Sequence, residues 1–171
     1  MMAIPEPSCG AIDLGVHRYA LRVYYEDTDA GGIVYHANYL RWFERARSDL
    51  LELLGIDQRA ALESGEGLYT VAEASLRYRA PARLGDAVVI ETFPETVGRV
   101  ACTLRQVARR GETRLCEAIV KVGFIGPDGR PRKQPAAWQH AFDSLVDGRM
   151  LSQSPATGPV SGLESGPEGL E

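Results

Sequence analysis

The sequence predicts an α+β domain, and three features of its apolar pattern lead to this prediction. One amphipathic helix lies between Gly32 and Gly55, and a strand precedes it. From Leu68 onward the apolar period changes to two, in four stretches of strand length separated by short turn-forming segments. Short turns favour antiparallel neighbours. A lone helix before four such strands can bury its apolar stripe only by lying across the concave face of the sheet.

The N-terminal part of the chain predicts an extension followed by a strand. Residues 1–15 combine prolines and glycines with little periodicity, so we expect an extension outside the core. Residues 16–26 alternate in the manner of a strand. The folded domain is expected to run from residue 16 to residue 147. Residues 148–171 are rich in Ser, Gly, Pro and Glu, which predicts a disordered tail.

The central helix is predicted from apolar residues that recur at spacings of three and four and therefore share one face. These are Tyr39, Phe43, Ala46, Leu50, Leu53 and Leu54. The other side is expected to carry Arg41, Glu44, Arg45, Arg47, Asp49 and Glu52. Gly55 is placed to end the helix in the left-handed conformation.

The remaining elements are expected to be strands, with one short helix before them and a helical segment after them. Residues 57–63 predict the short helix, and residues 134–145 the C-terminal segment. The strands are expected at residues 69–80, 87–97, 100–109 and 113–125, as a meander in chain order. In the first of them Ala72, Ala74, Leu76 and Tyr78 are expected to share a face. Gly and Pro mark the turns between them.

Composition excludes several classes of protein. The chain has 171 residues, 44% hydrophobic and 25% charged, which fits one globular domain. A net charge of −4 leaves no general basic surface for nucleic acid. No apolar run approaches the roughly 20 residues needed to cross a bilayer, and we see no signal peptide. The three cysteines lack metal-ligand spacing, so we expect no metal and no cofactor. Their odd, sparse number and the lack of a signal peptide predict a cytoplasmic location.

A turn with two carboxylates and two glycines leads into the central helix, at residues 27–32. The first N–H groups of a helix have no partners within it, so they can hold an oxyanion. A nearby carboxylate can attack a carbonyl or activate water. Gly31 and Gly32 leave room for a substrate to approach the backbone. Taken alone, these residues more often form an ordinary turn or helix cap.

The full string YEDTDAGGIVYHANY, followed by FERAR, closely resembles the hotdog-fold acyl-CoA thioesterases, in particular the 4-hydroxybenzoyl-CoA and Tol–Pal-associated branches. A second string, YRAPARLGD at residues 78–86, resembles a junction between strands in that family. The resemblance covers about residues 19–142. It implies an antiparallel sheet wrapped around the central helix.

The resemblance also implies roles for individual residues. Asp29 matches the catalytic carboxylate, and the backbone N–H of His36 would polarise the thioester carbonyl. Gly31 and Gly32 would contact the substrate. Three aromatic residues could line the acyl pocket, Tyr35, Tyr39 and Trp42, although aromatic residues at helical spacing also form plain core. The His36 imidazole could add orientation or have no chemical part. Asp27 is expected to brace the loop through backbone hydrogen bonds.

Coenzyme A carries phosphates, which require cations near the mouth of the pocket. The candidates are Arg99, at a turn where related enzymes contact CoA, and Arg79, with Arg83 as a further possibility; each could instead be a solvated surface arginine. His17 and His140 are expected at the surface. The family pairs its protomers with sites at the interface, so the resemblance implies a homodimer or homotetramer.

These expectations converge on an acyl-CoA thioester hydrolase that releases a free carboxylate and CoA. The substrate is expected to be a short- to medium-chain or aromatic acyl-CoA. One alternative is hydrolysis of acyl groups carried on acyl carrier protein. Another is a non-catalytic acyl-CoA-binding or envelope-associated partner protein that keeps the fold. A dehydratase of the same fold is disfavoured, because its His and Glu pattern is not seen.

Overall fold

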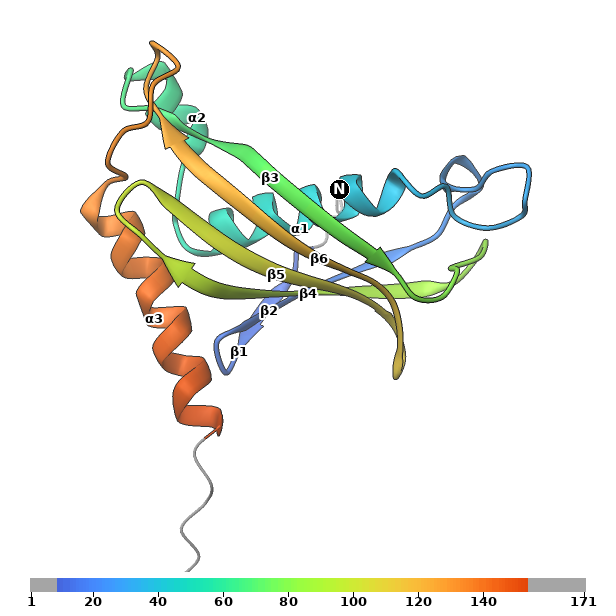
Figure 1. Ribbon diagram of the computed structural model, residues 1–171. Coiled ribbons are helices and arrows are strands. Elements are labelled where there is room, and N and C mark those ends of the chain that lie inside the picture. Colours follow the sequence, from blue (N-terminus) through green and yellow to red (C-terminus); the bar gives the residue numbers. More distant parts are fainter. Residues whose placement is uncertain (1–8, 154–171) are drawn as a thin grey trace, which may run out of the picture.

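A six-stranded antiparallel sheet wraps around one long helix in the computed structural model, which describes residues 9–153 (Figure 1). The strands are β1 (Ala11–Asp13), β2 (Val16–Arg22), β3 (Leu68–Tyr78), β4 (Ala87–Val97), β5 (Ala101–Arg110) and β6 (Thr113–Ile125). The helices are α1 (Asn38–Leu53), α2 (Gln58–Glu63), α3 (Ala136–Gln153) and a 3-10 turn, η1 (Tyr25–Asp27). The predicted α+β class is confirmed.

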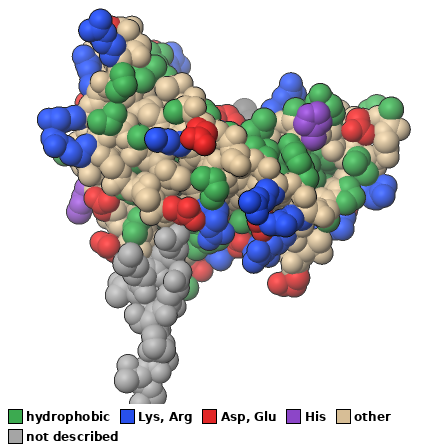
Figure 2. Space-filling model, viewed as in Figure 1, with side chains coloured by type: hydrophobic (Ala, Val, Ile, Leu, Met, Phe, Trp, Pro, Cys, Tyr) green, Lys and Arg blue, Asp and Glu red, His purple; other side chains and the backbone are tan. Residues whose placement is uncertain are grey.

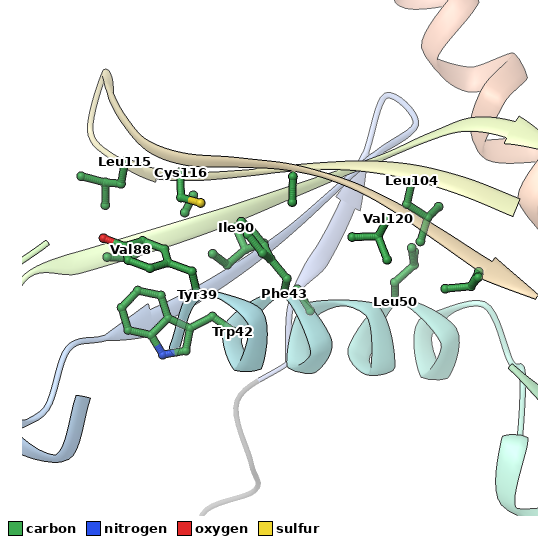
Figure 3. Close-up of a cluster of buried hydrophobic side chains, with 14 of the residues drawn as sticks. Tyr39, Trp42, Phe43, Leu50, Val88, Ile90, Leu104, Leu115, Cys116 and Val120 are labelled. Carbon is green, nitrogen blue, oxygen red and sulfur yellow. The ribbon is translucent and has the colours of Figure 1, made fainter. Parts of the chain in front are cut away.

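Helix α1 packs its apolar stripe against the sheet and forms the centre of the core (Figure 3). Phe43 and Leu50 are almost fully buried and face sheet residues such as Ile90 and Val120. The predicted left-handed end at Gly55 is confirmed by a φ of 70°. No helix within residues 9–153 is long and apolar enough to cross a membrane.

The predicted faces of α1 are wrong at two positions. Leu53 is 41% exposed, whereas Arg47 is only 8% exposed. Arg47 lies one turn after Phe43, on the side facing the sheet, and its guanidinium donates to Gln106 Oε1 at 2.7 Å and to Glu44. A buried charge is tolerated when it is paired and hydrogen-bonded in this way.

The predicted meander is confirmed for β4, β5 and β6 but is wrong for β3, because the strand order is β1-β2-β4-β5-β6-β3. β3 pairs with β6 and forms one edge of the sheet. Residues 79–86 then cross the end of the sheet to reach β4. Eight extended residues can reach about 26 Å, which exceeds the roughly 14 Å across three strand spacings. The crossing brings residues 79–86 against the start of α1, where Val34 N–H donates to Ala82 O at 2.9 Å.

A β-bulge in β3 changes which side chains face the helix. The pairing with β6 shifts between Val71 and Glu73. Val71 consequently lies opposite Val122 and lines the space against α1. The predicted face assigned Ala72 to this side, because an inserted residue cannot be recognised from alternation alone.

Regular secondary structure begins earlier and ends later in the chain than predicted. Residues 11–13 already form β1, which pairs with β2. Helix α3 continues to Gln153, beyond the predicted segment of residues 134–145. His17, predicted at the surface, is fully buried against Asp49, whereas His140 is exposed. The tail expected to be disordered lies, from residue 154 onward, outside the described residues.

Candidate active site

The loop that leads into α1 is a small hairpin held by backbone hydrogen bonds. Thr28 and Val34 form an isolated antiparallel bridge. Asp29 N–H donates to Ile33 O at 3.0 Å, and Gly32 N–H donates to Asp29 O at 3.0 Å. Gly32 has a φ of 70°, the left-handed region that favours glycine. The tip of the loop therefore presents residues 29–33 at one end of the sheet (Figure 1).

Asp27 braces this loop, as predicted. Its Oδ2 accepts a hydrogen bond from Tyr24 N–H at 2.8 Å. Its backbone carbonyl accepts from Tyr35 N–H and from Asn38 Nδ2, both at 2.8 Å. These contacts fasten the loop to the first residue of α1.

Asp29 lies exposed at the loop tip, with its carboxylate held by the loop itself. Oδ1 accepts a hydrogen bond from Gly31 N–H at 2.8 Å. A Cβ on residue 31 would lie 3.0 Å from that oxygen, so glycine permits this close approach. Oδ2 receives no hydrogen bond from residues 9–153. One carboxylate oxygen is thus fixed, and the other is open to a ligand.

The start of α1 carries two free amides. Ala37 is the N-cap and provides no side-chain cap. Within the described chain, neither His36 N–H nor Ala37 N–H donates to a protein acceptor. The carbonyls on the same two peptide planes are both engaged: Tyr35 O accepts from Asn38 N–H at 2.9 Å, and His36 O accepts from the Tyr78 hydroxyl at 3.1 Å. Free amides at a helix start can bind an oxyanion.

The two predicted tyrosines of the acyl pocket differ in their surroundings. Tyr35 is 46% exposed, and its ring lies 4.5 Å from that of His36. Tyr39 is 3% exposed, and its hydroxyl accepts Ala82 N–H at 3.1 Å. Burial raises the pKa of Tyr39, so its hydroxyl stays protonated. Through the hydrogen bond from Ala82 N–H, Tyr39 fastens residues 79–86 to the core.

The predicted cations lie at opposite ends of the molecule. Arg83 Nη1 approaches Gly32 O at 3.5 Å, beside the loop. Arg79 follows β3 and pairs with Glu117 at 3.2 Å; the hydrogen bond from Arg79 lowers the Glu117 pKa. Arg99 sits in the β4–β5 turn, at the far end of the sheet from residues 27–32 (Figure 1).

A groove between α1 and β3 begins one helical turn after His36. It has a volume of about 530 Å³. Apolar residues line part of it (Leu40, Val71, Ala74 and Val120), and charged residues of α1 line the rest (Arg41, Glu44, Arg45 and Arg47). Figure 2 shows exposed hydrophobic side chains on the face where β3 approaches the start of α1. Tyr35, Leu40 and Tyr78 are each at least 40% exposed. An apolar surface thus adjoins the free amides.

The described residues offer no other obvious chemistry at this end of the sheet. No group of three or more His, Cys, Asp or Glu side chains within residues 9–153 is arranged to hold a metal. Cys116 lies close by, but burial raises the pKa of its thiol to about 12, which keeps it protonated. Tyr78 was not predicted as a site residue. Its contact with His36 depends on β3 lying at the sheet edge, which local patterning does not reveal.

The chain is similar to known proteins both in sequence and in fold. Residues 31–117 match the model of the thioesterase superfamily. The acyl-CoA thioesterase YbgC of Haemophilus influenzae is 38% identical over 127 residues, which cover 71% of this chain and 93% of that protein. The corresponding protein of Helicobacter pylori is 40% identical over 135 residues, with coverage of 74% and 96%.

Solved structures confirm the hotdog fold. A probable thioesterase from Bartonella henselae superposes with a TM-score of 0.66 at 32% identity, covering 70% of this chain and 99% of that one. A 1,4-dihydroxy-2-naphthoyl-CoA thioesterase from Synechocystis gives a TM-score of 0.71 at 23% identity, covering 77% and 98%.

Proposed function

The chain belongs to the thioesterase superfamily, and on this premise we propose that it hydrolyses acyl-CoA thioesters to a free carboxylate and CoA. One observation is the main support for this proposal. The open oxygen of Asp29 and the free amide of His36 both belong to the short segment that enters α1. A nucleophile or base and an oxyanion donor are the two groups that acyl transfer requires.

In this mechanism Asp29 acts on the thioester carbonyl carbon. It either attacks the carbon directly, forming an anhydride that water then hydrolyses, or removes a proton from the water that attacks. As the carbonyl oxygen gains negative charge, the His36 N–H stabilises it. Collapse of the tetrahedral species breaks the C–S bond, and CoA leaves as the thiolate and takes up a proton. Gly31 and Gly32 leave space for the thioester beside the backbone.

We propose that a second copy of the chain completes the site. Asp29 and Tyr35 are exposed in the single chain. β3 is a long edge strand whose residues are mostly exposed, and such edges are normally covered. Pairing of two copies through β3, as a dimer or within a tetramer, would shelter the open side of the groove. It would also allow cations such as Arg99 of one copy to approach the site of the other. Arg83 stays beside its own loop, and Arg79 stays paired with Glu117.

The apolar part of the groove supports the proposal that the substrate is an acyl-CoA with an apolar acyl group, either short- to medium-chain or aromatic. Its lining begins one turn from the His36 amide, within reach of an acyl chain whose carbonyl lies at the amide. Two alternatives stay open: an acyl group delivered by acyl carrier protein, and a protein that binds acyl-CoA without hydrolysing it.

The test is release of free thiol from a panel of acyl-CoAs and acyl carrier protein thioesters. Asp29→Asn should lower kcat by at least about two orders of magnitude, the lower range for loss of a general base. Asp147→Asn, at an exposed position on α3, is the matched control and should keep full turnover. Binding of acyl-CoA without thiol release would favour the non-catalytic alternative, and near-normal turnover in Asp29→Asn would exclude the role of Asp29.

A further inference from the structure

Tyr78 connects the edge strand to the start of α1. It is the last residue of β3 and is half-exposed. Its hydroxyl donates to the backbone carbonyl of His36 at 3.1 Å. Its ring lies 5.7 Å from that of Tyr39 and 6.3 Å from that of His36, both near edge-on. Aromatic contacts of this geometry restrict the ring, so the hydroxyl is directed at one backbone atom.

That carbonyl belongs to the peptide plane between His36 and Ala37. In a trans peptide the C=O and the following N–H point in opposite directions, and the group is rigid. Holding the His36 carbonyl therefore determines where Ala37 N–H points. Within residues 9–153, the bond from Tyr78 is the one hydrogen bond that this peptide group makes. A hydrogen bond to a carbonyl also polarises the amide and strengthens its N–H as a donor.

The preceding peptide plane is held in the same manner. Tyr35 O accepts Asn38 N–H at 2.9 Å, and His36 N–H has no acceptor within residues 9–153. Two consecutive peptides thus have their carbonyls held by the protein and their N–H groups unpaired. Unpaired N–H groups at the start of a helix can bind an anion together.

We infer that Tyr78 is a positioning residue for the oxyanion site, which consists of two consecutive amides, His36 N–H and Ala37 N–H. The inference rests on the proposed hydrolysis of a thioester and adds a second donor to it. Tyr78 does not touch the substrate carbonyl in this role; it acts through the peptide that carries Ala37 N–H. Because β3 is also the exposed edge of the sheet, Tyr78 connects the site to the strand through which we propose that a second copy binds.

Two substitutions test the inference directly. Tyr78→Phe removes the hydroxyl and keeps the ring, and it should lower kcat about three- to tenfold, the effect of one neutral hydrogen bond, with KM within twofold. Ala37→Pro removes the second donor at a position whose φ of −71° already suits proline. It should lower kcat by at least about tenfold, less than loss of a sole oxyanion donor. Ala37→Gly keeps the N–H and is its control; Tyr25→Phe, at a tyrosine that is 83% exposed, is the control for Tyr78→Phe.

Combining the substitutions separates positioning from a merely structural role. If Tyr78 acts through Ala37 N–H, Tyr78→Phe should change kcat by less than about twofold in the Ala37→Pro background. The same loss in both backgrounds, or a wild-type kcat in Tyr78→Phe, would overturn the inference while leaving the proposed hydrolase intact. A wild-type protein that releases no thiol would overturn both. If circular dichroism shows that Ala37→Pro is unfolded, the kcat of Tyr78→Phe alone tests the inference. An effect of Tyr78→Phe on KM without a loss of kcat would contradict it.

Discussion

His17 Nε2 lies 2.7 Å from Asp49 Oδ2, and this contact joins β2 to α1 beneath the sheet. The His17 side chain is fully buried, and the Asp49 carboxylate is 11% exposed. His17 Nδ1 is buried without a hydrogen-bond partner in the described chain. The histidine is therefore held by one strong contact and is otherwise removed from water.

This burial predicts a pH dependence of stability. Burial lowers the His17 pKa from its usual 6.5, while the hydrogen bond and charge of Asp49 act in the opposite direction. The unfolded chain then binds the proton more readily, so stability is fully present above pH 6.5 and is lost as pH falls. Urea unfolding between pH 7.5 and 5.5 should show this loss, with a slope of at most about 1.4 kcal/mol per pH unit.

The matched control is His140, which is exposed on α3. His17→Gln should abolish the slope in this window, and His140→Gln should leave it unchanged. Carboxylates with lowered pKa values, such as Asp86 and Glu117, titrate at lower pH and do not contribute in this range. An equal slope in wild type and His17→Gln would contradict the assignment.

Gly10 depends on the same pair of side chains. Its N–H donates to both oxygens of Asp49, at 3.1 and 3.0 Å. A Cβ at this position would lie 2.5 Å from Arg18 O and 2.7 Å from His17 Nε2. Gly10→Ala should therefore reduce the free energy of unfolding by about 1–3 kcal/mol, the usual cost of overpacking. Gly123→Ala, where no atom of the described chain lies within 4 Å of the added Cβ, should not reduce it.

Substitution of Arg47 is expected to lower the free energy of unfolding more strongly. Its guanidinium donates to Gln106 Oε1 at 2.7 Å and to Glu44, and Gln106 Nε2 in turn donates to Phe43 O at 3.0 Å. Arg47→Ala would leave Gln106 Oε1 buried without its donor, so unfolding should become easier by about 3 kcal/mol. Arg59→Ala, which breaks an ion pair whose arginine is 88% exposed, should cost less than about 0.5 kcal/mol. Similar losses in both variants would contradict the view that burial decides the effect.

The parts of the predicted fold that the structure confirms depend on residues close together in the sequence, and the parts that it contradicts depend on contacts between distant segments. Strands 87–97 and 113–125 and the end of α1 at Gly55 follow from alternation and turn residues, and the structure confirms them. The position of β3 does not, because pairing with β6 instead of β4 is a choice between distant segments. The burial of Arg47 has the same cause, since Gln106 lies 59 residues away.

The candidate site was predictable to a similar extent. Asp29, Gly31, Gly32 and His36 lie within eight consecutive positions, so the sequence alone shows that they belong to one segment. The hydroxyl that holds the His36 carbonyl comes from Tyr78, 42 residues later. Its contact depends on the strand order, and alternation along β3 predicts only that Tyr78 faces the same side as Leu76. The catalytic roles themselves stay predictions.

His36 offers a test that separates side chain from main chain. The imidazole makes no hydrogen bond within residues 9–153, whereas the backbone amide is free to bind an oxyanion. His36→Ala keeps that amide, so kcat should stay within about threefold of wild type, far from the 10²–10³ effect of losing an oxyanion donor. Thiol release at saturating acyl-CoA measures this. A loss of two orders of magnitude would instead assign chemistry to the imidazole.

The exposed edge of β3 predicts self-association. Val71 is 47% exposed, lies on the side of β3 that faces the groove, and belongs to an edge strand of 11 residues. If two copies pair along this edge, Val71→Glu places two like charges in the interface and should shift the protein to the mass of one chain in light scattering. Ile119→Glu is the control, because Ile119 is 41% exposed on β6 but projects away from α1.

Since the site is proposed to be completed by the second copy, Val71→Glu should also lower kcat/KM at dilute protein. A wild-type protein with the mass of one chain and full turnover would contradict this arrangement.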